Sequence, residues 1–189
     1  MEENLKQRAD FYLKKVEAAL AALDRAAVAE FVAELTAARD RGGWIYTCGN
    51  GGSAMTASHF VGDLMKGASY GKPSRFKAHC LADNSPTLLA YANDVSYDEV
   101  FVEPLVNLLT PDDLVVGISG SGNSPNVVKA IEYANSRGAV TVGLCGYDGG
   151  KLKQAARHSV HVALHDMLVV EDVHMALCHL AVFLHGAGC

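Results

Sequence analysis

The sequence has little charge and no long apolar run. Charged residues make up 20% of the 189 positions, and the net charge is −5. Lysine and arginine form no basic cluster, so the electrostatic footprint of a nucleic-acid-binding protein is missing. Apolar runs fall short of the roughly 18 residues that cross a bilayer. We therefore expect a soluble protein with no nucleic-acid partner and no membrane partner.

The chain also lacks the cysteine pattern of a disulfide-bonded or zinc-finger protein. Its five cysteines are odd in number and share no CxxC spacing. The first residues, Met1 to Asn4, are polar and do not open a basic and then apolar leader. These absences predict a cytoplasmic protein in which most cysteines are reduced and buried.

Apolar periodicity predicts a single domain, residues 1–189, in which strands and helices alternate. Residues 5–41 have helical spacing that is interrupted at Asp24, a residue type that caps helices. Further helices are expected at 53–66, 85–91, 98–109, 125–137, 150–156 and 169–184, and strands at 44–48, 76–81, 114–118, 139–145 and 159–163. This alternation favours an α/β fold with a doubly wound parallel sheet, which binds ligands at the carboxyl ends of its strands.

The N-terminal helices, residues 1–41, carry more apolar surface than the α/β core of residues 42–189 can cover. Apolar positions run almost the whole length of this helical hairpin. We expect a partner subunit to cover part of that surface, so the hairpin is predicted to serve oligomerisation.

Two turns rich in glycine and serine follow two of the predicted strands. The first is Gly49–Ser53, and the second is Ser119–Ser124. Each turn leads into a predicted helix and offers hydroxyls, backbone N–H groups and a helix N-terminus to an anion. The simplest alternative is that such glycines only relieve backbone strain. The three serines of the second turn, 119, 121 and 124, favour a phosphate.

The phosphate predicted here does not belong to a nucleotide. A Walker A loop would need a Gly-Lys-Ser/Thr sequence, which neither turn has. The first turn also fails the GxGxxG spacing of dinucleotide-binding folds. A phosphate monoester on a small molecule is the remaining interpretation, because neutral hydroxyls and a helix dipole hold such a group without a lysine.

His59 and Asp63 lie four residues apart on the predicted helix after the first turn, so they share one helical face. They can bind one metal ion or serve one proton transfer, although such a pair is more often an ordinary hydrogen-bonded pair. The terminal helix adds Glu171, His174 and His179. Spacing alone leaves these alternatives open.

The motifs together resemble the sugar isomerase (SIS) domain family. The resemblance rests on Cys48–Ser53, Ala92–Asp94, Gly117–Val127 and Gly146–Leu152, and it covers nearly the whole chain. Within the family, the chain is similar to the isomerases that act on sedoheptulose 7-phosphate. The resemblance implies a flavodoxin-like three-layer αβα sandwich and a homotetramer with active sites at subunit interfaces.

The resemblance also carries site residues over to this sequence. In the similar isomerases, a His and a Glu four residues apart, and a Gln and a His eight residues apart on the last helix, form the metal and catalytic set. These positions are His59, Asp63, Glu171 and His179 here, so both histidines match, while Glu is exchanged for Asp and Gln for Glu. The resemblance places the substrate against Asn50, Gly51, Gly52, Ser53, Asp63, Asn93, Asp94, Ser119, Gly120, Ser121, Ser124 and Glu171.

Two imidazoles and two carboxylates are ligands that Zn²⁺ accepts, so we expect one zinc ion in each site. Glu171 and His179 are about 12 Å apart along a helix, which is too far for both side chains of one copy to hold one ion comfortably. We therefore expect two chains to build each site. Gly120 stands where the family usually has threonine, which removes one hydroxyl contact.

The resemblance implies interconversion of sedoheptulose 7-phosphate and D-glycero-D-manno-heptose 7-phosphate through an enediol, with Asp63 and His179 as base and acid. The segment His165–Val170 lacks the Asp-Arg that usually precedes the last-helix Gln, which leaves a different sugar phosphate open. The competing hypothesis is a non-catalytic SIS protein that regulates a partner, like a regulator of replication initiation. That regulator lacks the helix carboxylate and the final histidine, so Asp63 and His179 favour the enzyme.

Overall fold

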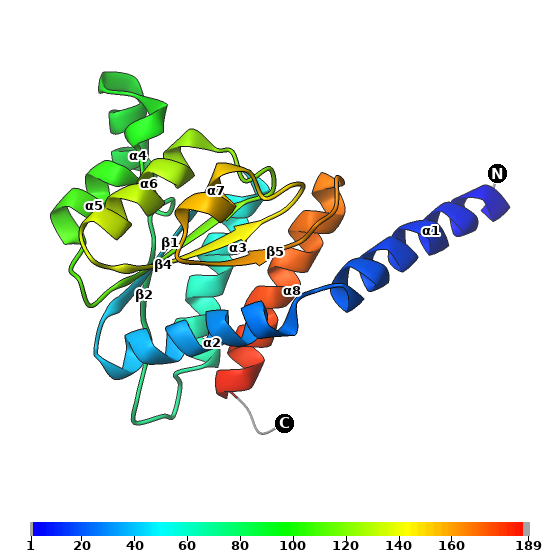
Figure 1. Cartoon of the computed structure of the whole chain (residues 1–189), viewed down its shortest axis with the longest axis horizontal. Helices are drawn as coiled ribbons and strands as arrows, with labels where there is room; N and C mark the ends of the chain where they lie inside the picture. The colour runs from blue at the N-terminus through cyan, green and yellow to red at the C-terminus, as the bar shows by residue number, and fades with distance from the viewer. Residues whose placement is uncertain (1, 187–189) are drawn as a thin grey trace.

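The chain forms a three-layer αβα sandwich around a five-stranded parallel sheet (Figure 1). The computed structural model describes residues 2–186. The strand order is β2-β1-β3-β4-β5, and every neighbouring pair is parallel. The strands are β1 (Trp44–Gly49), β2 (Lys77–Cys80), β3 (Leu114–Ser119), β4 (Val140–Cys145) and β5 (His158–His161). This topology confirms the expected flavodoxin-like sheet.

Helices cover both faces of the sheet. One face carries α2 (Arg25–Asp40), α3 (Gly52–Gly62) and α8 (Met167–Gly186). The other face carries α5 (Val102–Leu108), α6 (Pro125–Ser136) and α7 (Gly150–Ala155), while α4 (Ser85–Asp94) has no buried residue. Because both faces are covered, β3 is buried along its whole length, as is typical of a central parallel strand.

The first helix, α1 (Glu2–Ala21), projects from the sandwich as an arm (Figure 1). It ends before Asp24, whose carboxylate accepts hydrogen bonds from the first backbone N–H groups of α2, as predicted. The arm is attached to the start of α8, because Lys15 pairs with Asp166 and the Tyr12 hydroxyl donates to Asp172 at 2.5 Å. This hydrogen bond raises the pKa of Tyr12 to about 12.

The helix predicted at residues 53–66 is present, but it changes from α-helical to π-helical winding near its end. Helix α3 ends at Gly62, and a π-helical turn follows over Asp63–Gly67. The Ala68 N–H donates to the Asp63 carbonyl at 2.9 Å, five residues back, which is the spacing of a π-turn. Periodicity did not reveal this turn, since one inserted residue hardly changes the apolar pattern.

Helix α8 is long and apolar enough to meet the length and composition criteria for a membrane span, with a mean hydropathy of 1.7 over Met167–His185. Its buried side chains, among them Val173, Leu177 and Ala181, lie in the core under α2 and α3. Of this apolar stretch, 39% is buried within the sandwich. The four cysteines within the described residues are free and buried, as expected, and Cys189 lies outside those residues.

Candidate active site

The two serine turns meet at the carboxyl ends of neighbouring strands. Gly49 at the end of β1 pairs with Ile118 of β3, so the turns that follow lie side by side. They enclose a small cavity of about 110 Å³. Its lining is Asn50, Ser53, Ile118, Ser119, Gly120, Ser121, Ser124, Met167 and Glu171. The convergence expected from the sequence is therefore found, and we refer to this cavity as the serine pocket.

The hydroxyls of the serine pocket are uncharged and closely spaced. Ser53 and Ser119 are buried, and the Oγ atoms of Ser119 and Ser124 lie 3.0 Å apart. Ser124 precedes α6 but makes no capping bond to that helix. Its hydroxyl instead faces Ser119, so the N-terminus of α6 and two hydroxyls are available to one anion.

The second turn is held in place by the loop after β4. Gly122 has a φ of +67°, and a Cβ at this position would lie 2.1 Å from the Gly149 carbonyl oxygen. The Leu152 N–H donates to the Gly122 carbonyl at 2.8 Å, and the Gly146 N–H donates to the Gly120 carbonyl at 3.0 Å. Only glycine combines this backbone conformation with this close approach. The turn is therefore preformed.

A polar residue that was not predicted as part of the site orients Asn50. The buried Asn126 exchanges two hydrogen bonds of 2.9 Å with the Asn50 amide, and the Tyr97 hydroxyl donates to Asn50 Oδ1 at 2.9 Å. Asn126 lies two residues after the second serine turn, so its place in that motif was a usable signal. Tyr97 left no such signal, because its contact depends on the tertiary fold.

The His59, Asp63 and His179 side chains form a second cluster, on α3, the π-helical turn and α8. Asp63 Oδ2 lies 3.2 Å from His59 Nε2 and 3.7 Å from His179 Nε2, and the two imidazole nitrogens are 3.0 Å apart. All three side chains are between one third and just over one half exposed. Two imidazoles and one carboxylate that converge in this way match the ligand set of catalytic zinc sites, which keep one position open.

Glu171 lies away from this cluster, in the serine pocket. Its carboxylate is packed against Gly52, the first residue of α3, where a Cβ would be 2.7 Å from Glu171 Oε2. His59 is seven residues further along α3, a rise of about 10 Å. Of the four expected zinc ligands, the structure therefore brings three together within one chain.

Of the remaining predicted substrate contacts, two lie at the serine pocket and two lie away from it. Gly51 and Gly52 form the exposed start of α3 at the serine pocket, and Gly51 has a φ of +53°. Asn93 and Asp94 lie at the exposed end of α4, where the Asn93 amide donates to Asp94 at 2.7 Å. Neither of these two residues lines the serine pocket.

One buried histidine, which the terminal-helix spacing left open as an alternative site residue, lies near the site. His174 is on α8, one turn beyond Glu171, and neither of its ring nitrogens has a hydrogen-bond partner among the described residues. Burial lowers the pKa of His174 to about 4, so its imidazole is neutral at pH 7.

Comparisons with known proteins agree with this geometry. The SIS domain family matches residues 11–146. A phosphoheptose isomerase from Trichlorobacter lovleyi is 35% identical over 167 residues, which cover 88% of this chain and 83% of that protein. The structure of phosphoheptose isomerase GmhA from Neisseria gonorrhoeae superimposes with a TM-score of 0.86 at 27% identity, covering 94% of this chain and 96% of the other.

A phosphoheptose isomerase from Francisella tularensis shares the fold with a TM-score of 0.89 at 22% identity, covering 97% of this chain and 98% of the other. The chain therefore belongs to the SIS domain family and, within it, to the phosphoheptose isomerases.

Proposed function

We infer that the chain is an aldose–ketose isomerase that converts sedoheptulose 7-phosphate to D-glycero-D-manno-heptose 7-phosphate in the cytoplasm. The observation that carries this proposal is the spacing between two chemically different clusters on the same pair of helices. The serine pocket lies at Gly52 and Glu171, and the His59–Asp63–His179 cluster lies about two turns further along α3 and α8.

The length of the substrate matches this spacing. An extended chain advances about 1.2 Å per bond, so the carbonyl end and the phosphorus of a seven-carbon sugar phosphate lie on the order of 10 Å apart. With its phosphate in the serine pocket, such a substrate reaches the His59–Asp63–His179 cluster with carbons 1 and 2. Isomerisation takes place at these two carbons.

In the proposed reaction, Asp63 and His179 transfer the proton. One of them removes a proton from the carbon beside the carbonyl, and the enediol that results is reprotonated on the neighbouring carbon. The two side chains lie 3.7 Å apart, so both can reach adjacent carbons of one substrate. Ser119 and Ser124 hold the phosphate during this step, which keeps carbons 1 and 2 next to Asp63 and His179.

His59, Asp63 and His179 are also the residues that would hold a zinc ion, because their ligand atoms already converge. With the ion bound, Asp63 or His179 would be a ligand instead of the proton-transfer group, so each of them takes one role or the other. A bound Zn²⁺ supplies a Lewis acid that polarises the substrate carbonyl. Three protein ligands leave one coordination position open for the substrate, and the Glu171 carboxylate, which lies in the serine pocket of its own chain, does not supply a fourth. We propose that a second copy of the chain completes the site.

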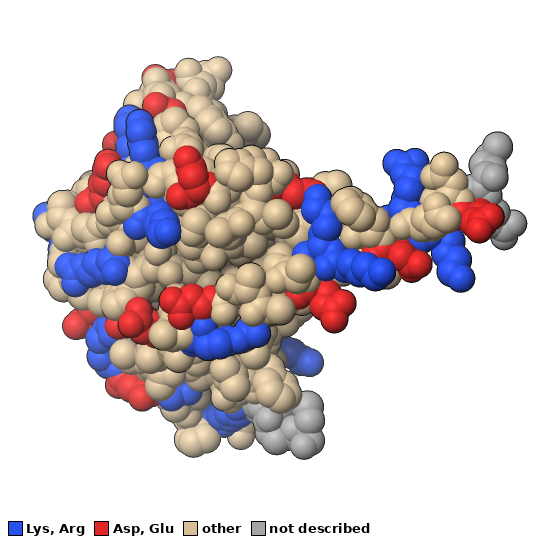
Figure 2. All heavy atoms as spheres, turned by 45° about the vertical axis from the view of Figure 1, so that its right-hand side comes forward, with Lys and Arg blue, Asp and Glu red and all other residues tan. Residues whose placement is uncertain are grey.

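Exposed apolar side chains support a homotetramer built through the arm. Leu5, Phe11 and Leu13 on α1 are all more than 60% exposed, and Phe183 and Leu184 on α8 are more than half exposed. Figure 2 shows the arm standing clear of a body whose visible face carries both charge signs interspersed.

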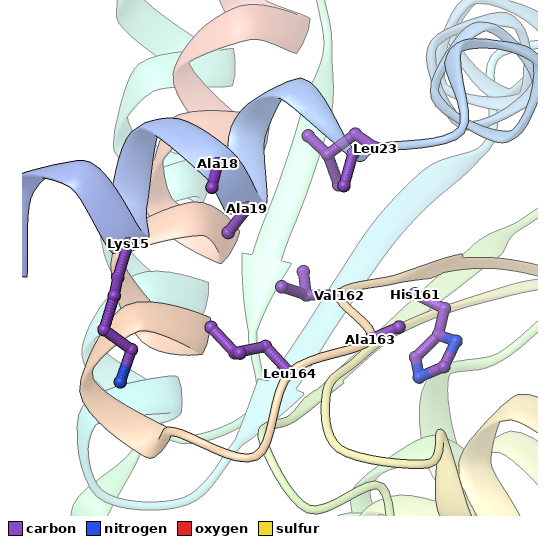
Figure 3. A pocket seen from close by; sticks show the side chains of 9 residues that line it. Lys15, Ala18, Ala19, Leu23, His161, Val162, Ala163 and Leu164 are labelled. Carbon is purple, nitrogen blue, oxygen red and sulfur yellow. The ribbon is translucent and has the colours of Figure 1, made fainter.

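A hollow of about 250 Å³ also opens beneath α1 (Figure 3). Ala18, Ala19 and Leu23 face Val162 and Leu164 across it, and Lys15 and His161 lie at its two ends. Light scattering of the purified protein should give four times the chain mass. A stable monomer with full activity would contradict the shared site.

The proposed activity is tested by incubating the purified protein with sedoheptulose 7-phosphate and following the products by NMR. We expect aldose product to accumulate, and we expect a chelator to slow the reaction in a way that added zinc reverses. Binding of the sugar phosphate without turnover, with or without zinc, would instead favour a non-catalytic SIS protein.

A further inference from the structure

One wall of the serine pocket is a methionine that lies on a glycine. Met167 begins α8 and lines the pocket together with Gly120 of the second serine turn. A Cβ added at Gly120 would lie 2.3 Å from Met167 Sδ and 3.2 Å from its Cε atom. The thioether therefore occupies the space that a side chain at position 120 would fill.

The first turn of α8 also packs closely against the loop after β4, through Val170. A Cβ at Gly146 would lie 2.5 Å from Val170 Cγ1, and the Gly146 N–H donates to the Gly120 carbonyl at 3.0 Å. Two glycines thus allow Met167 to rest directly on the backbone of the second serine turn and Val170 on that of the loop after β4. Met167 is 38% exposed, so it is an outer wall of the pocket with one side open to solvent.

This wall has two chemical consequences. A thioether is at most a weak acceptor, so it leaves the serine hydroxyls free for the phosphate oxygens. It also keeps the cavity at about 110 Å³, well below the roughly 300 Å³ of ordinary ligand pockets. A monoester places three free oxygens in such a pocket and has one substituent to lead out of it, whereas a diester needs space for a second substituent.

We propose that Met167 and Gly120 form a complementary pair that sets the size of the phosphate end of the site and makes it selective for phosphate monoesters over diesters. The proposal rests on the isomerase function for its kinetic readout. Met167 is a specificity-determining residue here and takes no part in proton transfer, since it lies at the serine pocket rather than at the His59–Asp63–His179 cluster.

The test is a double-mutant cycle with Gly120→Ser, Met167→Ala and the two combined. Gly120→Ser should displace the thioether from its place as the pocket wall and raise the KM for sedoheptulose 7-phosphate about 10-fold, with kcat changed less than about 3-fold. Adding Met167→Ala should remove the clash, so the double variant should recover at least about 5-fold of that loss. Additive effects of the two substitutions would overturn the pairing.

Selectivity is tested with two small inhibitors, methyl phosphate as the monoester and dimethyl phosphate as the diester. Met167→Ala should narrow the ratio of their inhibition constants at least about 5-fold, and Val106→Ala, an exposed site on α5, should leave it unchanged. An unchanged ratio in Met167→Ala would refute the selectivity.

Calorimetric binding of inorganic phosphate to all four proteins gives a readout that needs no turnover. If the wild type binds phosphate but does not isomerise the sugar, the isomerase function fails. The Gly120–Met167 pair is then still judged by the phosphate affinities, and thermal unfolding checks that each variant is folded.

Discussion

The serine pocket and the His59–Asp63–His179 cluster are built in different ways. The serine pocket is made by two turns at the ends of adjacent strands, and its geometry is fixed by backbone hydrogen bonds and by glycines such as Gly122. The cluster depends on side chains from α3 and α8 that are 120 residues apart in sequence and largely exposed. A preformed pocket suits binding, while an exposed set of ionisable groups suits chemistry that needs protons and a metal ion.

The largest effect is expected on kcat, from substitutions in the His59–Asp63–His179 cluster. Asp63→Asn and His179→Ala should each lower kcat by 10²-fold to 10⁴-fold, a typical range for lost acid–base catalysis, and should leave KM within a few-fold. Steady-state assays with sedoheptulose 7-phosphate measure both constants, and Glu132→Gln, an exposed carboxylate on α6, serves as the control. Undiminished turnover in both variants would eliminate the assigned roles.

His174 lies on α8, the helix that carries residues of both regions. We expect this histidine to make the free energy of unfolding depend on pH. Because its folded pKa of about 4 is below the usual 6.5, the unfolded chain binds the proton more readily. Stability should therefore fall as the pH decreases from about 6.5 to about 4, by about 3 kcal/mol from this group. Urea unfolding over this pH range should show that His174→Leu loses less stability than the wild type. Parallel curves for the two proteins would contradict the buried neutral imidazole.

The serine pocket should respond in KM rather than in kcat. Ser119→Ala and Ser124→Ala should each raise KM about 10-fold, because each removes one hydroxyl from the phosphate. Their hydroxyls lie 3.0 Å apart, so we expect the double variant to differ from the product of the single effects. A fall in kcat with unchanged KM would mean that the phosphate is held elsewhere.

The smallest effect is expected at Asn126, which hydrogen-bonds the pocket residue Asn50. Asn126→Ala leaves the Asn50 amide without its partner, which should raise KM about 3-fold and cost about 1 kcal/mol of stability. Urea unfolding and steady-state kinetics measure the two quantities. Asn126→Asp keeps an acceptor for the Asn50 amide and should lie between the wild type and Asn126→Ala; an unaltered KM in both would remove Asn126 from the positioning of Asn50.

The sequence predicted most of the fold because its strands are short apolar segments bounded by glycine turns. The cap at Asp24 and the alternation of strands and helices required only local patterns. The π-helical turn at Asp63 and the separation of α4 from the core were missed, since each depends on packing rather than on periodicity.

The site could be predicted in part for the same reason. The serine turns carry their geometry in consecutive residues, and helical spacing indicated the His59–Asp63 pair. The position of Glu171 in the serine pocket, and of Met167 on Gly120, follows from how α8 lies on the sheet. Asn93 and Asp94 were carried over from the family resemblance, and no local pattern could show that the exposed end of α4 lies outside the pocket lining.

The parallel alignment of α3 and α8 gives the site a fixed span, with a consequence for shorter sugars. A five-carbon sugar phosphate has the same phosphate but is two bonds shorter, so its carbonyl would stop about 2.5 Å before the imidazoles. Such compounds should occupy the protein as competitive inhibitors that are turned over poorly. The enzyme would in this way discriminate against shorter sugar phosphates by their length alone.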